Sequence, residues 1–417
     1  MRLWTKVLSL VGVGIITWTV PLIPDTDASG SAVKVKAKEI RHDLAGDFKG
    51  NLKNIDVTST EGQAVLTLSQ GATTGTYTSP VLNPRFSFTD VGAHWKDQHH
   101  QHPKVSIRVS TDRKHWTDWT PAEVSHAEGP EGKSHRETFT DLLLGYRGKY
   151  IQYQIQLKPG NRVQDFQLTL LNSEEGAPTA HTSRKWTLSS YLWQQAEAAV
   201  SRPPIVSRAQ WGADESLRFN PDGSEEWPRE YDTVTHLVIH HTATQNNDPD
   251  PAARVRSIYY YHTVTRDWGD IGYNAIIGSD GRIYEGRHGR DGEVLSPGVI
   301  GAHAYSFNHG SFGVAVMGSY DSTQLPESMR KPLIDLLAYE ADHWNINPRA
   351  KRDFVRDYEY NDPSIPKTDH DIPTIQGHGL LPRQTTECPG NSNESDLPSI
   401  RRDVAERMSD RSLKGGE

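Results

Sequence analysis

The chain has 417 residues, with 53 acidic and 45 basic side chains and a formal net charge of −8. This length is typical of two or three domains. The negative balance disfavours nucleic acid as a partner, because phosphate binding needs a basic surface. Cys388 is the only cysteine, which excludes an intrachain disulfide and a cysteine-rich zinc finger.

The first segment, 1–32, has the pattern of a secretory signal peptide. Arg2 and Lys6 precede a long apolar stretch, and small residues follow it. A basic start, an apolar run and a small-residue cleavage site are the parts of such a signal. An uncleaved membrane anchor is the alternative, but Pro21 and Pro24 shorten the run below the roughly 20 residues of a spanning helix. We expect an exported protein that contacts a membrane only if this segment is retained.

The next segment, 33–175, alternates apolar and polar residues with a period of two. Val105, Ile107 and Val109 are one example, and Pro159-Gly160-Asn161 is one of the turn signals between such stretches. Short alternating strands separated by turns predict an antiparallel, jelly-roll-like β-sandwich.

Aromatic and histidine side chains in this segment have two interpretations each. Trp95, Trp116 and Trp119 either stack on sugar rings or fill the sandwich core, and the core is favoured because aromatic residues carry large buried areas. The four histidines between His94 and His102 either hold a transition metal or form a solvated loop. The solvated loop is favoured because their spacing is irregular.

Residues 176–204 are predicted to form a linker, and residues 205–410 a separate α/β domain followed by a tail at 411–417. Apolar runs of strand length and a hairpin signal alternate here with helical periodicity. The predicted strands include Val234–Ile239 and Phe312–Met317, and the hairpin turns at Ser279-Asp280-Gly281. Three helices are predicted. The first begins at Asp250-Pro251, the second includes Leu333–Trp344, and the third begins at Pro398. The expected fold is a mixed sheet flanked by three helices.

The metal-binding candidates lie at the ends of these elements. His240-His241 ends the first strand, and His378 and Cys388 share a Gly/Pro-rich loop. Two imidazoles and one thiolate suit Zn²⁺ and leave a fourth position open for water, as catalytic zinc sites do. A strand-end histidine bonded to backbone and a small buried cysteine are the structural alternatives.

Several ordered motifs in this half resemble the peptidoglycan recognition protein and zinc amidase type 2 family. They are "IVSRAQWGA", "VTHLVIHHTAT", "WGDIGYNAIIGSDGRIYEGR", "GAHA" with "SFGVAVMGSY", and "GH" with "TTECPG". Together they cover about Ile205 to Met408, and ordered motifs are far more specific than any single one. The resemblance implies the amidase type 2 fold. It also implies N-acetylmuramoyl-L-alanine amidase activity in a secreted, cell-wall-associated protein, with peptidoglycan as the partner.

The resemblance also assigns roles to individual residues. It implies His240, His378 and Cys388 as zinc ligands and Tyr273 as the catalytic tyrosine. It also implies Thr386 as a second catalytic residue, at a position where members carry either a catalytic lysine or a threonine. Further residues are similar to those that line the substrate groove: His241, Trp268, Arg287, His303 and Asn308.

Single features of this segment leave alternatives open. The spacing from His378 to Cys388 exceeds the family's usual spacing by two residues, so the loop either bulges or distorts the site. Only one of His240 and His241 can face the metal, because adjacent strand residues point to opposite sides. Trp268 is alternatively a core residue and Arg287 a surface ion pair. Glu285 is either a catalytic carboxylate or part of a salt bridge, and the salt bridge is favoured.

Two other functions compete with the zinc amidase. One is a secreted peptidoglycan receptor with an inert site, which the retained Cys388 and Tyr273 disfavour. The other is a cysteine peptidase with Cys388 as nucleophile and His378 as base. The cysteine does not begin a helix after a strand, so no helix dipole would lower the pKa of its thiol.

Overall fold

The computed structural model describes residues 32–97, 102–125, 129–130, 137–143, 145–174, 200–356 and 366–409. The predicted signal peptide and most of the predicted linker lie outside these ranges, as do His99, His100 and the tail. Among the described helices, none combines the length and apolar character needed to cross a bilayer.

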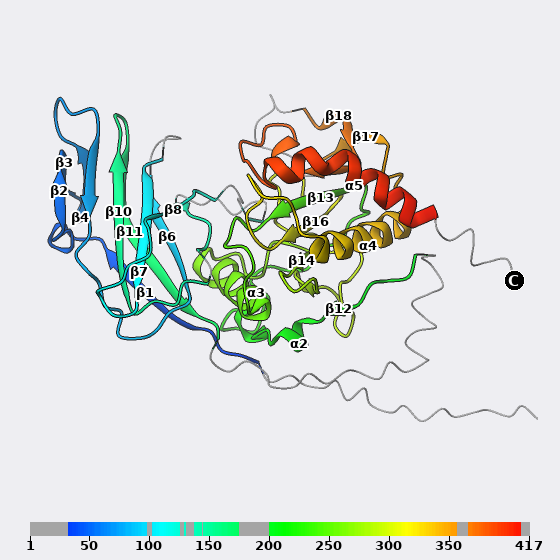
Figure 1. The fold of residues 1–417 in the computed structure, drawn as a ribbon, viewed down its shortest axis with the longest axis horizontal. Helices are drawn as coiled ribbons and strands as arrows, with labels where there is room; N and C mark the ends of the chain where they lie inside the picture. The colour runs from blue at the N-terminus through cyan, green and yellow to red at the C-terminus, as the bar shows by residue number, and fades with distance from the viewer. Residues whose placement is uncertain are drawn as a thin grey trace, which may run out of the picture.

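The N-terminal half is a sandwich of two antiparallel sheets (Figure 1). One sheet has the order β3-β4-β11-β6-β9, with β1 also paired to β11, and the other has the order β2-β5-β10-β7-β8. The strands are β1 (Lys36–His42), β2 (Asn51–Lys53), β3 (Ile55–Thr60), β4 (Gln63–Leu68), β5 (Gly75–Thr78), β6 (Asp90–Lys96), β7 (Lys104–Ser110), β8 (Thr120–Ala122), β9 (Glu137–Phe139), β10 (Tyr150–Leu157) and β11 (Arg162–Asn172). A single 3₁₀ turn, Ala45–Asp47, follows β1. The period-two pattern therefore predicted the sandwich correctly.

Aromatic side chains from both sheets meet in the sandwich core. Phe166 of β11 stacks on Tyr153 of β10 with ring centroids 4.6 Å apart, and Trp95 is 1% exposed beside it. The core interpretation holds for Trp95 alone. Trp116 and Trp119 are half-buried and lie against the guanidinium of Arg108, 4.9 and 4.6 Å from their ring centroids. The reason is that β7 directs Arg108 away from the core, and the two indoles pack against its guanidinium outside the core.

The predicted solvated histidine loop is wrong for His94. This residue belongs to β6, is buried, and stacks on Phe139 while its Nδ1 lies 2.9 Å from Glu137. His102 lies 3.2 Å from an Asp97 oxygen.

The C-terminal half is built on a mixed six-stranded sheet in the order β12-β15-β14-β16-β13-β19, parallel except for the β14–β15 hairpin. Its strands are β12 (Ile205–Val206), β13 (His236–His241), β14 (Ala275–Ile277), β15 (Ile283–Glu285), β16 (Ser311–Val316) and β19 (Ile375–Gly377). A separate hairpin pairs β17 (Lys351–Val355) with β18 (Thr368–Pro373). This arrangement confirms the predicted α/β sheet and its hairpin.

Three long helices flank this sheet, as predicted. They are α3 (Pro251–Tyr260), α4 (Glu327–His343) and α5 (Asn391–Ser409), and a short four-residue helix, α2 (Arg208–Trp211), precedes them. The short turns are η2 (Glu215–Arg218), η3 (Tyr261–Thr265) and η4 (His378–Leu380). Asp250 caps α3 through the Ala253 N–H, with Pro251 in the first turn. The predicted start of the last helix is wrong, because α5 begins at Asn391 and Pro398 lies inside it.

The sandwich packs directly on α3, which lies between the two halves (Figure 1). Buried Arg254 of α3 pairs with Asp90 and Glu174 of the sandwich and with Asp248. The Tyr261 hydroxyl donates to the Thr140 carbonyl at 2.8 Å. Phe139, Leu142 and Leu171 of the sandwich belong to the hydrophobic core of the C-terminal half. A buried charge without its partner costs several kcal/mol, about 3–5, so these pairs favour one fixed arrangement.

Candidate metal centre

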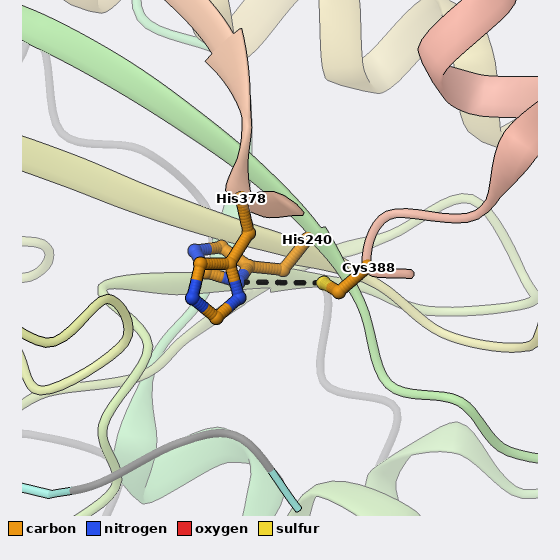
Figure 2. A group of neighbouring side chains, drawn as sticks. All are labelled: His240, His378 and Cys388. Atoms are coloured by element: carbon orange, nitrogen blue, oxygen red, sulfur yellow. Dashed lines mark hydrogen bonds between the residues drawn. The ribbon is translucent and has the colours of Figure 1, made fainter. Parts of the chain in front are cut away.

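Three side chains from separate segments converge at one edge of the mixed sheet. His240 lies near the end of β13, His378 follows β19 directly, and Cys388 precedes α5. Because β13 and β19 are parallel neighbours, their carboxyl ends lie at the same edge. One ligand atom from each residue lies within 4.8 Å of the others. Figure 2 shows the three side chains beside one another. Two imidazoles and one thiol are a donor set that suits Zn²⁺.

The longer loop between His378 and Cys388 keeps both side chains in reach of His240. The Gly379 N–H donates to the Cys388 carbonyl at 2.6 Å, which closes the base of the loop. Gln384 fixes its far side, because its Nε2 donates to the Tyr305 carbonyl and its Oε1 lies 3.1 Å from His378 Nε2. The loop therefore bulges outward without separating the candidate ligands.

Thr386 acts on the cysteine's backbone. Its Oγ1 accepts the Cys388 N–H at 3.1 Å. The side chain is half-buried. The geometry gives Thr386 a positioning contact.

A row of hydrogen bonds orients His240. Its Nδ1 lies 3.6 Å from Cys388 Sγ, and its Nε2 lies 3.0 Å from His303 Nδ1. With Nδ1 on the side of the ligands, the ring proton of His240 belongs on Nε2 and is donated to His303. His303 then carries its own proton on Nε2, 3.4 Å from Ser311 Oγ, whose hydroxyl donates to the Phe307 carbonyl. Metal-binding histidines are oriented by this kind of partner.

Close packing holds His303 in this row. A Cβ added to Gly313 of β16 would lie 2.2 Å from the His303 ring, so only glycine fits there. Burial lowers the pKa of His303 to about 3 and holds the pKa of His240 well below its ordinary value. Both imidazoles are thus neutral at neutral pH, as ligand binding requires.

His241 points away from the candidate ligands, as the alternation along β13 predicts. Its Nδ1 accepts the Tyr320 N–H at 3.4 Å, and burial lowers the pKa of its imidazole to about 4. Its backbone N–H donates to Cys388 Sγ at 3.4 Å. Burial raises the pKa of the Cys388 thiol, and this N–H opposes that effect because it stabilises a thiolate.

Tyr273 lies beside the three candidate ligands. Its ring centroid is 5.4 Å from that of His240, and the side chain is half-buried. Burial raises the pKa of its phenol well above the ordinary value, with a further contribution from Cys388. The phenol therefore keeps its proton at neutral pH and is a hydrogen-bond donor to whatever enters the cleft.

All five residues predicted to line a groove, His241 included, are buried instead. Trp268 is 0% exposed, in ring contact with His262, and Gly129 of the sandwich lies against its indole. Arg287 is neither in a groove nor in a surface pair, because its guanidinium is buried and bonded to Asp270 at 3.0 Å. His303 and Asn308 are each 1% exposed. Asn308 Oδ1 accepts the backbone N–H groups of His303 and Ala304 and so positions the histidine.

The expected salt bridge of Glu285 is also absent among the described contacts. This buried carboxylate accepts the backbone N–H groups of Arg208 and Leu295 at 3.0 and 2.9 Å. Sequence reasoning missed Gln384, Ser311 and a sandwich residue, Asp141, beside Tyr273. Only Gln384 had a signal in the sequence, because it lies inside the "GH…TTECPG" loop that carries two candidate ligands. Ser311 and Asp141 are brought to the site only by the fold.

The fold and the site together define a class of protein. It is an α/β domain with two histidines and a cysteine at the edge of a mixed sheet. The family described as N-acetylmuramoyl-L-alanine amidase matches residues 230–391. The chain is 31% identical to peptidoglycan recognition protein 1 of Bos taurus over 182 residues, which are 43% of this chain and 86% of that protein. It belongs to the peptidoglycan recognition protein and type 2 amidase family.

Other similarities cover smaller shares. The chain is 32% identical over 179 residues to a Homo sapiens protein named N-acetylmuramoyl-L-alanine amidase, which is 41% of this chain. This chain spans only 26% of that human relative's length. Among solved structures, wild-type Drosophila PGRP-LB is similar at 26% identity with a TM-score of 0.33, over 47% of this chain and 93% of that chain.

Proposed function

We propose that the C-terminal half hydrolyses the amide bond between N-acetylmuramic acid and L-alanine in peptidoglycan, with zinc bound by His240, His378 and Cys388. The observation that carries this proposal is the convergence of the three ligand atoms within 4.8 Å beside Tyr273. Family membership supports it, because the matching family is described as N-acetylmuramoyl-L-alanine amidase.

The donor set fits a zinc ion. It combines two neutral imidazoles with a sulfur that accepts a backbone N–H, and His303 and Gln384 hold the two rings in place. When bound there, zinc supplies Lewis acidity and lowers the pKa of a water molecule toward about 7.

Tyr273 supplies a hydrogen bond at the reacting carbonyl. Its raised phenol pKa rules out a role as base near neutral pH, so the hydroxyl donates to the oxygen on which negative charge develops. Thr386 and the His241 N–H hold Cys388, and His303 holds His240. Each of these residues acts through a candidate ligand.

A cysteine peptidase is less consistent with the geometry. Cys388 Sγ lies 3.6 Å from Nδ1 of His240, as the dashed line in Figure 2 shows, and a ring nitrogen of His378, the predicted base, also lies within 4.8 Å of the sulfur. Burial raises the pKa of the Cys388 thiol, whereas a nucleophilic cysteine needs a lowered one. A receptor with an inert site has no need of the retained Cys388 and Tyr273.

Metal removal tests the proposal. The purified exported protein should contain about one zinc ion per chain. EDTA should abolish release of peptide from a muramyl peptide, and added zinc should restore it. Activity that persists without metal would overturn the proposal and favour the peptidase, while zinc binding without hydrolysis would favour the receptor.

We also propose where the protein works and how the chain is divided. The segment 1–32 would direct export, so the protein would act outside the cell on the cell wall, with peptidoglycan and not nucleic acid as its partner. The sandwich would occupy 33–175 and the amidase domain 205–410. Mass analysis of the mature protein tests the first point, because an N-terminus at Met1 would contradict cleavage.

A further inference from the structure

The two sheets of the sandwich turn their outer faces in opposite directions. In the first sheet, β6 directs Asp90 and Gly92 at the C-terminal half, where Asp90 pairs with Arg254 and Gly92 lies against the Tyr261 ring. The second sheet, β2-β5-β10-β7-β8, forms the other side of the sandwich. Alternate residues of its strands β7 and β10 fill the sandwich core, so the residues between them point outward. This outer face is therefore turned away from the half that carries the metal centre.

The outward residues of the second sheet form polar rows across its strands. Gln156 of β10 is in register with Thr76 of β5 on one side and with Lys104 of β7 on the other, and Thr76 is in register with Lys53 of β2. All four side chains are at least partly exposed. The next row consists of Asn51, Thr78, Gln154 and Ser106. The two rows thus present hydroxyl, amide and ammonium groups in a regular array.

A hollow opens at the end of this face where the first row lies. Its volume is about 320 Å³, within the range of about 300–1,000 Å³ that is usual for ligand pockets. Lys104 and Gln156 line it, together with Lys158 just beyond β10, and both lysines are exposed. The described lining residues include no carboxylate, and Asp97, which pairs with lining residue His102, has a side chain only 3% exposed. The hollow therefore favours an anionic group.

Two indoles lie farther along the same face. Trp116 and Trp119 are half-buried and flank the guanidinium of Arg108, which also donates to the Gln152 side-chain oxygen at 2.6 Å. Arg108 follows Lys104 by four residues on β7, which is about 13 Å along a strand. One face of a pyranose ring carries C–H groups that pack on aromatic rings, while its hydroxyls need hydrogen-bond partners. The indoles and the polar rows supply both kinds of contact.

We infer that this outer face is a second binding surface for peptidoglycan, with glycan rings on Trp116 and Trp119 and an acidic stem peptide at the hollow beside Lys104 and Lys158. The inference rests on the proposed function for the identity of the polymer. Peptidoglycan combines pyranose rings with peptide carboxylates, and the face combines indoles and amides with exposed ammonium groups. Because the surface is turned away from the metal centre, it does not present the scissile bond. It holds the enzyme on the insoluble wall and so raises the local concentration of that bond.

Cosedimentation with insoluble peptidoglycan tests the surface separately from the metal centre. The full chain is mixed in EDTA with peptidoglycan from which acid has removed phosphate-containing polymers. We expect Trp119→Ala, and Lys104→Glu combined with Lys158→Glu, each to weaken binding about 5- to 10-fold. Lys351→Glu is the matched control and should bind as wild type does, because Lys351 is equally exposed but lies on β17, opposite Pro373 before β19.

Hydrolysis of a soluble compound completes the test. N-acetylmuramoyl-L-alanyl-D-isoglutamine is too small to reach both surfaces, so all variants should keep the wild-type kcat/KM on it while losing hydrolysis of the insoluble wall. Melting temperatures establish that the variants are folded, and the two lysine changes are exposed.

The outcomes separate the two proposals. Unchanged cosedimentation of the folded Trp119→Ala and lysine variants would overturn the inference and leave the amidase standing. Wild-type binding that requires the phosphate-containing polymers would also overturn it, because the face would then recognise a different polyanion. Failure of the wild type to hydrolyse either substrate would overturn the proposed function, whereas weaker cosedimentation of the variants would still support the second surface.

Discussion

His303 gives the most quantitative prediction, because the structure makes it a support of the metal centre instead of a substrate contact. In His303→Ala the buried Nε2–H of His240 loses its acceptor at 3.0 Å, and Gly313 faces a void in place of the ring. Loss of such a partner commonly lowers metal affinity about 10- to 100-fold. That range corresponds to a loss of about 1.4–2.7 kcal/mol in the free energy of zinc binding. The loss agrees with the cost of about 1–3 kcal/mol for one buried polar group left without a hydrogen-bond partner.

Competition with a chromophoric chelator measures this loss. The variant should be folded by circular dichroism, should bind zinc about 10- to 100-fold more weakly, and should regain activity when zinc is in excess. His115→Ala is the control, since His115 is an exposed sandwich residue paired with Asp112. A folded His303→Ala protein with wild-type zinc affinity would refute the assignment of His303 as the support of His240. Normal zinc affinity with a raised KM would instead restore its predicted place in the groove.

Three further substitutions have distinct expected results. Tyr273→Phe should keep zinc and lose on the order of 100-fold in turnover, because one donor to the developing charge is removed; wild-type turnover would contradict that role. Cys388→Ser should lose zinc and hydrolysis while the fold and the binding of peptidoglycan fragments persist, and surviving activity in a hydrolysis assay would exclude Cys388 as a ligand. Burial raises the pKa of Glu340 to about 7. The folded state therefore holds a proton that the unfolded state releases, and wild type should lose about 3 kcal/mol of stability as pH rises from 4.5 to about 7. Glu340→Gln should remove this loss in denaturant titrations, and an unchanged pH dependence would contradict it.

Local patterns predicted much of the fold. Alternation at Val105–Val109 indicated the sandwich, Asp250-Pro251 marked the start of α3, and the hairpin signal at 279–281 was confirmed. Pro398 misled because proline is typical of a first helical turn, yet α5 begins earlier and continues through it.

The candidate ligands were also predictable, since their spacing follows strand ends and the family's motifs. Long-range packing decided the rest. Arg287 is buried because it forms an ion pair with Asp270, which is itself buried. His303 can support His240 because the glycine at position 313 of β16 leaves room for its ring. Asp141 reaches the cleft only because the sandwich packs on α3. None of these contacts has a local signature in the chain.

Digestion of purified peptidoglycan, with mass analysis of the products, tests the central claim most directly. The wild-type protein should release stem peptides with free L-alanine amino termini and leave the glycan strands intact. Cys388→Ser and the EDTA-treated protein should release none. Cut glycan strands, stems cut within the peptide, or unchanged release by the Cys388→Ser protein would contradict a zinc-dependent amidase.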